Sequence, residues 1–268
     1  MKALLPAFIA ITSSFGALSM AEPMKIEVRR LPESAAATTT FLNPEYVVAS
    51  PAAAQATDKT PLLIFLHGAG ERGTDLTQLK SVPPIRHFSQ QTEQPFLIVV
   101  PQCAPDKAGK KDEWLAADLE VLFKQLEKDQ PFDKSRVYLI GYSMGGYGTW
   151  LWGSAHPERF AGLAPHAGGL GSGGPRAVSS DLTGWAKRLA PLPIWIFHGD
   201  RDNVVPPERS ERMHTLLKST GAKQVRLTIL AGQGHGIGGN LSNPELYAWL
   251  LRHRRQGNHV VESPLPLK

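Results

Sequence analysis

The amino-acid sequence predicts an α/β protein: a single domain in which a mostly parallel, twisted sheet is flanked by helices. Three observations lead to this fold class. Short apolar runs bounded by turn residues alternate with segments of helical periodicity, several of these runs lack the alternation of a half-exposed strand, and no linker divides the chain. With 268 residues, 42% of them hydrophobic, the chain is long enough to bury a sizeable core.

The apolar runs predict strands, which we place at residues 25–31, 62–66, 96–100, 137–140, 160–163, 194–197 and 225–230. Helical periodicity is carried by leucines between 115 and 126, and by Met213, Leu216 and Leu217 before Gly221. A last helix is expected to begin at Asn243 and Pro244. Its end is expected to hold a basic cluster, made of Arg252, Arg254 and Arg255. We expect a loose tail from about residue 258.

The first 21 residues have the pattern of a cleaved secretory signal peptide. Lys2 supplies the positive start, residues 3–11 are apolar apart from Pro6, and small residues surround the expected cleavage after Ala21. The predicted mature domain is therefore 22–268, either secreted or periplasmic. The apolar run is too short to span a bilayer, and no other stretch approaches the roughly 20 apolar residues that a spanning helix needs. We expect no stable membrane association.

Charge and cysteine content exclude several classes of function. The 29 basic and 24 acidic residues give a net charge of +5 without the concentrated stripe typical of nucleic-acid binding. Cys103 is the only cysteine, so neither an intrachain disulfide nor a cysteine-based metal cluster can form. Its expected role is that of a small buried hydrophobic residue. No close-spaced metal-binding pair is present, and we expect no metal and no cofactor.

A glycine-flanked serine follows the apolar run at 137–140. The sequence Gly-Tyr-Ser-Met-Gly-Gly at 141–146 leads from that strand into a helical segment. A serine on a sharp strand-to-helix turn projects above the carboxyl edge of the sheet, and the glycines at 141 and 145 leave room for neighbouring chains. The helix that follows directs its positive end at the same place. The pattern predicts that Ser143 is a nucleophile.

A serine nucleophile needs a base and an acid, and the downstream sequence offers both. Asp200 and Asp202 follow the strand at 194–197, and the spacing alone does not distinguish between them. His235 lies in a glycine-rich loop after the strand at 225–230. The chain order of serine, aspartate and histidine is that of the α/β-hydrolase triad.

These motifs together resemble the small α/β-hydrolase esterases, in particular phospholipase/carboxylesterase-like and dienelactone-hydrolase-like proteins. The resemblance rests on LHGAGERG at 66–73, PQC at 101–103, the serine turn, HGDRDNVVP at 198–206 and GH at 234–235, and it covers residues 60–250. It implies that Asp202, the second aspartate of its motif, is the triad acid. It also implies a catalytic row of Ser143, His235 and Asp202. The connections between the predicted elements are mostly short, so we expect no large lid domain.

The same resemblance implies an oxyanion hole formed by the backbone N–H groups of Ala69 and Met144. His67 precedes Ala69 and is the alternative candidate for the base. In related loops, however, this histidine braces the oxyanion turn through its own hydrogen bonds. We therefore expect His67 and His198 to be structural.

The expected function is hydrolysis of short or medium acyl or aryl esters through an acyl-enzyme. Substrates linked to carbohydrate, such as acetyl or feruloyl esters, fit an exported enzyme. One alternative is a serine peptidase like the catalytic domain of prolyl oligopeptidases, although the propeller domain of those enzymes is missing. Another is a non-catalytic binding protein on a hydrolase scaffold. The sequence leaves the acyl and alcohol specificity and the oligomeric state open.

Overall fold

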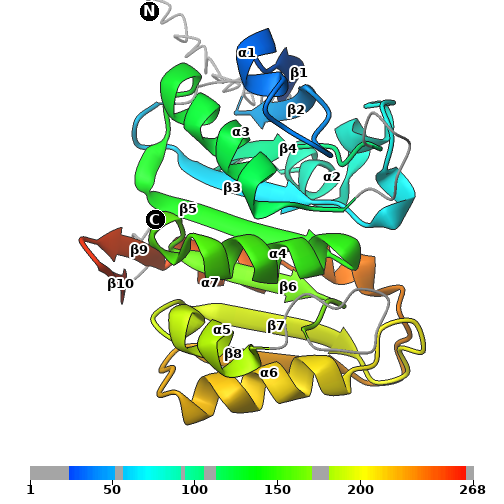
Figure 1. The fold of residues 1–268 in the computed structure, drawn as a ribbon, viewed down its shortest axis with the longest axis vertical. Helices are drawn as coiled ribbons and strands as arrows, with labels where there is room; N and C mark the ends of the chain where they lie inside the picture. Colours follow the sequence, from blue (N-terminus) through cyan, green and yellow to red (C-terminus); the bar gives the residue numbers. More distant parts are fainter. Residues whose placement is uncertain (1–23, 52–56, 92–93, 106–112, 171–180, 264–268) are drawn as a thin grey trace, which may run out of the picture.

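The computed structural model in Figure 1 describes residues 24–51, 57–91, 94–105, 113–170 and 181–263. The expected signal peptide lies outside these residues. An eight-stranded sheet forms the centre of the domain, with strand order β1-β2-β4-β3-β5-β6-β7-β8. The pairs β1–β2 and β2–β4 are antiparallel, and the other neighbours are parallel. The strands are β1 (Lys25–Arg30), β2 (Glu45–Ser50), β3 (Pro61–Leu66), β4 (Leu97–Val100), β5 (Asp133–Tyr142), β6 (Gly162–His166), β7 (Ile194–Gly199) and β8 (Val225–Leu230).

Helices cover both faces of this sheet (Figure 1), so the predicted fold class is confirmed. Along β3, alternate side chains enter two separate cores: Leu62, Ile64 and Leu66 belong to one core, and Leu63 and Phe65 to the other. The first core also contains the apolar sides of α3 (Ala116–Asp129), α4 (Met144–Ala155), α5 (Leu182–Leu189) and α6 (Glu208–Ser219). The second contains those of α2 (Pro83–Ser89) and α7 (Pro244–Leu251).

The remaining helical elements are short. They are α1 (Glu33–Ala36) and the 3-10 turns η1 (Ala69–Glu71), η2 (Gln78–Ser81), η3 (Pro157–Arg159) and η4 (Ile237–Ser242). No lid domain is found in the described part of the chain, whose longest internal gap is the ten residues 171–180. Within the same residues, no helix is long and apolar enough to cross a membrane.

The predicted strands are all found, and the central sheet contains one strand that was not predicted, β2. β2 lies between β1 and β4 and pairs with both, so it joins the edge strand to the rest of the sheet. Two predicted strands also shift in extent. β5 begins at Asp133, four residues before its apolar run, and β6 begins at Gly162 and continues to His166.

The expected C-terminal end is wrong in two respects. Helix α7 begins as predicted, with the Asn243 side chain accepting a hydrogen bond from the Glu245 N–H, but it ends at Leu251. Arg252 is the C-cap of this helix, as expected, but Arg254 and Arg255 lie beyond it. The chain continues into a hairpin of β9 (His253–Gln256) and β10 (His259–Glu262), in place of a loose tail from 258. Arg255 fastens this hairpin to the domain by donating to the carbonyl oxygens of Pro157 and Phe160.

A buried carboxylate attaches the segment before β2 to the helical layer. Asp118, in the first turn of α3, is 4% exposed and accepts hydrogen bonds from the backbone N–H groups of Thr40 and Phe41, at 3.0 and 2.7 Å. The next residues of this segment continue the contact, because the Asn43 side chain donates to the Gln102 side chain at 2.8 Å. Asp118 therefore holds this segment against α3, and Asn43 holds it against Gln102, which follows β4.

Replacing Asp118 by alanine is expected to lower the free energy of unfolding by about 2–3 kcal/mol, because two backbone donors lose a charged acceptor. Asp118→Asn keeps one acceptor and should lose less. Asp129→Ala, at the exposed end of the same helix, is the control and should change the free energy by less than about 0.5 kcal/mol. Urea unfolding measures all three, and equal losses in the first and third variants would contradict this assignment.

Three of the buried histidines of the domain have a pKa below the ordinary value. His166 and His198 are 0% exposed and His253 is 1% exposed. Burial lowers the pKa of each, and that of His166 falls to about 4. These rings are therefore neutral in the folded protein at pH 7, whereas in the unfolded chain they titrate near pH 6.5.

Stability should consequently fall as the pH is lowered from about 6.5 to about 4, because the unfolded chain then binds protons that the folded chain does not. By linkage, His166 alone accounts for about 3 kcal/mol over this range. Urea unfolding as a function of pH measures the slope. His166→Phe, which keeps a ring to stack on Phe197, should flatten that slope, and an unchanged slope would show that His166 does not cause it.

Candidate active site

Ser143 occupies a strained turn between β5 and α4. Its backbone has φ 54° and ψ −114°, a conformation that residues with a side chain rarely adopt. The Ser143 N–H donates to the carbonyl oxygen of His166, at the end of the neighbouring β6. A Cβ on Gly145 would lie 1.8 Å from the carbonyl oxygen of Leu66, so only glycine permits this approach to β3. The turn therefore lies between the carboxyl ends of two strands.

The three residues predicted to form the triad lie in one hydrogen-bonded row. Ser143 Oγ is 2.8 Å from His235 Nε2, and His235 Nδ1 is 2.7 Å from Asp202 Oδ2. The Asp202 side chain is fully buried, whereas 20% of the His235 side chain is exposed. Because Asp202 can only accept, Nδ1 of His235 carries the proton, and Nε2 is then free to accept from the serine hydroxyl.

Asp202 is fixed on its other side by the turn that follows β7. Its Oδ1 accepts the backbone N–H groups of Val204 and Val205, at 2.9 and 2.8 Å. Burial raises the pKa of Asp202, but the hydrogen bonds from Val205, His235 and Val204 outweigh it, and the net pKa lies below the usual value. Asp202 is therefore ionised at neutral pH. Asp200, the other aspartate of the motif, is exposed.

Gly199 allows the loop that carries His235 to approach this turn. A Cβ at Gly199 would lie 2.3 Å from the carbonyl oxygen of Gln233 and 2.4 Å from that of Gly234. The same Gln233 carbonyl accepts the N–H of Arg201 at 2.9 Å. The acid and the histidine are thus brought together by direct backbone contact between their loops.

The two backbone donors predicted for an oxyanion hole each begin a helical element. Met144 is the first residue of α4 and Ala69 the first of η1, and N–H groups at such positions have no partner within their own helix. The loop that carries Ala69 is held by the residues after β4. Gln102 Nε2 donates to the carbonyl oxygens of Glu71 and Asp75, and the Cys103 N–H donates to His67 Nε2 at 3.0 Å.

His67 is fully buried, and the hydrogen bonds of its ring are made to residues other than Ser143. Its Nε2 accepts from Cys103, and its Nδ1 lies 2.6 Å from the carbonyl oxygen of Gly68, to which it donates. The Trp114 indole N–H donates to the His67 carbonyl oxygen. Both ring nitrogens are therefore engaged in holding this loop, and the imidazole that contacts the serine is that of His235.

Tyr142 is a neighbour of the site that was not predicted from the sequence. Its hydroxyl donates to the carbonyl oxygen of His235 at 2.7 Å, and its ring lies beside Gly68. Tyr142 therefore touches both the histidine loop and the loop of Ala69. Its place directly before the serine was the only sequence signal for this position.

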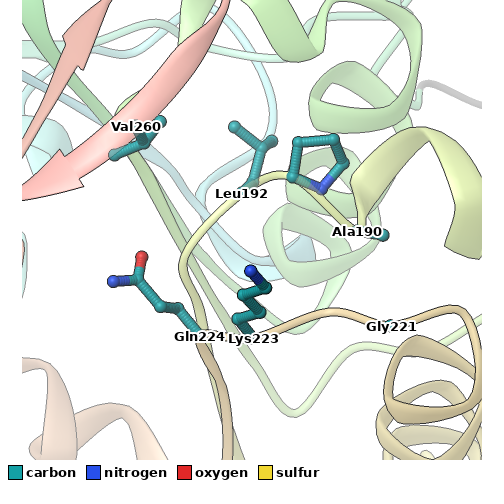
Figure 2. Close-up of a pocket in the computed structure, with 7 residues that line it drawn as sticks. Ala190, Leu192, Gly221, Lys223, Gln224 and Val260 are labelled. Carbon is teal, nitrogen blue, oxygen red and sulfur yellow. The ribbon is translucent and has the colours of Figure 1, made fainter.

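Of two pockets in the structure, one adjoins the candidate site and the other lies outside it. One of about 290 Å³ adjoins the loop of His235 and is lined by Leu230, Gln233, Gly236, Ile237, Gly239 and Asn240. Another, of about 360 Å³, lies where the chain enters β7 and β8 and is lined in part by Leu192, Gln224 and Val260 (Figure 2). That is the sheet edge opposite Ser143, so the second pocket lies outside the candidate site. In the described ranges, no group of three or more His, Cys, Asp or Glu residues is arranged to hold a metal ion.

Comparison with known proteins adds independent evidence. A bifunctional acetylxylan esterase/xylanase of Neocallimastix patriciarum is 28% identical over 159 residues, which are 57% of this chain and 21% of that protein. A thermostable esterase of known structure superposes with a TM-score of 0.65 at 26% identity, covering 88% of this chain and 64% of that one. A feruloyl esterase of Anaeromyces mucronatus gives a TM-score of 0.57 at 14% identity, covering 82% and 88%, which shows the shared fold.

The chain thus spans about a fifth of the fungal relative and under two thirds of the thermostable esterase. The family model for dienelactone hydrolases matches residues 102–243, which include the serine turn, the acid turn and the histidine loop. This match covers more than half of the 268 residues. The chain belongs to the dienelactone hydrolase family.

Proposed function

We propose that the protein is a serine carboxylic-ester hydrolase. The observation that carries the proposal is the row of Ser143, His235 and Asp202 at the carboxyl edge of the sheet, with both hydrogen bonds under 3 Å. A serine hydroxyl is a weak nucleophile on its own, and this row supplies a base with a fixed tautomer and a buried carboxylate to hold it.

In the proposed reaction, Ser143 Oγ attacks the ester carbonyl while His235 Nε2 takes its proton. The tetrahedral intermediate carries its negative charge on the former carbonyl oxygen, and the N–H groups of Ala69 and Met144 stabilise that charge. His235 then gives the proton to the departing alcohol, which leaves the acyl group on the serine. Water, deprotonated by the same imidazole, hydrolyses the acyl-enzyme.

The proposed substrates are esters of short or medium acyl or aryl acids with small alcohols, including acetyl and feruloyl groups on carbohydrate. The pocket beside His235, at about 290 Å³, is slightly smaller than the roughly 300–1,000 Å³ typical of ligand pockets and suits a small leaving group. Two amide side chains, Gln233 and Asn240, line it and can bond to hydroxyl groups. The similarity to acetylxylan and feruloyl esterases supports this substrate class. The signal peptide expected from the sequence supports action outside the cytoplasm.

The purified mature protein is expected to hydrolyse nitrophenyl acetate and butyrate, and Ser143→Ala to lower kcat by about 10⁴- to 10⁶-fold, because the nucleophile is lost. Ser219→Ala, on the exposed end of α6, is the matched control and should keep full activity. Release of nitrophenolate measures all three proteins. Cleavage of prolyl amides in preference to esters would identify a peptidase instead, and activity on neither would favour a binding protein.

Asp202→Asn is expected to lower kcat by about 10⁴-fold at neutral pH. The two N–H groups of Val204 and Val205 hold the amide oxygen at the Oδ1 position, so the amide NH₂ faces His235 and donates to its Nδ1. The imidazole proton then lies on Nε2, which can no longer accept from Ser143.

The matched control is Asp200→Asn, which removes the same charge from an exposed position two residues away. It should leave kcat within about twofold, because surface changes outside the site have small effects. Equal losses in the two variants, measured with the same nitrophenyl ester, would refute the assignment of Asp202 as the acid.

A further inference from the structure

A second imidazole lies on the acid of the row. His198, near the end of β7, is fully buried, and its Nε2 lies 2.8 Å from the carbonyl oxygen of Val205 and 3.2 Å from Oδ2 of Asp202. Both of these oxygens can only accept hydrogen bonds, because Asp202 is ionised. Nε2 of His198 therefore carries a proton and donates to both.

The other nitrogen of His198 is held by α6. Nδ1 lies 2.7 Å from Oγ of Ser210, a fully buried serine whose hydroxyl is also 3.0 Å from the carbonyl oxygen of Gly168. Burial lowers the pKa of His198, so the ring is neutral and Nδ1 has a lone pair that needs a donor. The single proton of the Ser210 hydroxyl has two acceptors in reach, the Gly168 carbonyl oxygen and Nδ1 of His198, and Nδ1 can share it in the tautomer with the ring proton on Nε2.

Four donors thus surround the carboxylate of Asp202. Oδ1 receives the N–H groups of Val204 and Val205, and Oδ2 receives His235 and His198. The titratable groups that face the carboxylate at hydrogen-bond distance are these two imidazoles, one from β7 and one from the loop after β8. With donors on both oxygens, the plane of the carboxylate cannot rotate without losing a hydrogen bond to a buried group.

We infer that His198 is a positioning residue for the reaction: it donates to the oxygen of Asp202 that holds His235, and so fixes the orientation of the base toward Ser143. This inference rests on the proposed esterase function for its kinetic consequences. His198 does not touch the serine, and it acts only through Asp202. A misplacement of about 1 Å in such a row can lower the rate by about 100-fold.

A merely structural role, in which His198 fills space between β7 and α6, predicts different behaviour of two amide variants. The amide nitrogen of glutamine reaches the place of Nε2 and can still donate to Asp202. The shorter amide of asparagine reaches the place of Nδ1, so it can bond to Ser210 but not to Asp202. The pair therefore separates the hydrogen bond to the acid from the polarity of the side chain.

The test measures kcat, KM and the downfield proton resonance of the His235 Nδ1–H in wild type, His198→Asn and His198→Gln, with folding checked by circular dichroism. We expect His198→Asn to lower kcat by about 10- to 100-fold at unchanged KM and to weaken or shift the resonance, and His198→Gln to restore most of both. Unchanged kcat and resonance in a folded His198→Asn, or equal losses in both variants, would overturn the inference.

One further variant and one comparison keep the test decisive. If the His198 variants do not fold, Ser210→Ala leaves the ring in place but removes the donor to Nδ1, and it should weaken the same resonance; an unchanged resonance would overturn the inference. The resonance also separates the two proposals. If the wild-type protein hydrolyses no ester, the proposed function is refuted. If the resonance is present in the wild type and lost in His198→Asn, the role of His198 in holding Asp202 is still supported.

Discussion

The close approach of the serine turn to the ends of two strands is the constraint on which the rest of the site depends. A Cβ on Gly145 would lie 1.8 Å from the carbonyl oxygen of Leu66, and one on Gly146 would lie 2.6 Å from that of His166. Since these obstacles are backbone atoms, no side chain could be accommodated by a change of rotamer. The glycines therefore let the start of α4 lie between β3 and β6, and this places Ser143 and the Met144 N–H beside the loops that follow the other strands.

The loops around this turn are held by buried polar groups whose hydrogen bonds are made within the protein. Gln102 donates to two carbonyl oxygens of the loop that carries Ala69. After β7, the carboxylate of Asp202 contacts the buried imidazole of His198. In a dry interior an unmade hydrogen bond is costly, so such networks keep one arrangement strongly preferred over others. Rigid placement of the site thus comes from polar contacts at the sheet edge, while the two apolar cores hold the sheet itself.

Much of the fold was predictable because the central strands are buried on both faces and so read as continuous apolar runs. β2 was missed because its short apolar run lies between Pro44 and Pro51, which are signals for a loop. The C-terminal hairpin was missed because arginines after a helix suggest a helix end. The position of the hairpin depends on a distant contact, because Arg255 binds carbonyl oxygens about one hundred residues earlier in the chain. Local sequence carries no trace of that partner.

In the site, too, some features follow from local sequence and others depend on distant contacts. The serine turn could be located from local sequence, because glycine spacing records the close approach directly. The choice between Asp200 and Asp202 could not, because it depends on which carboxylate the turn after β7 directs inward. The N–H groups of Val204 and Val205 both donate to Asp202, whereas Asp200 is exposed to solvent. An acid at the exposed position would be solvated by water and free to rotate, and it could not fix the tautomer of a neighbouring imidazole. The inward turn therefore does more than bury a charge: it provides the acid with the donors that keep it ionised, and it leaves one lone pair directed at His235.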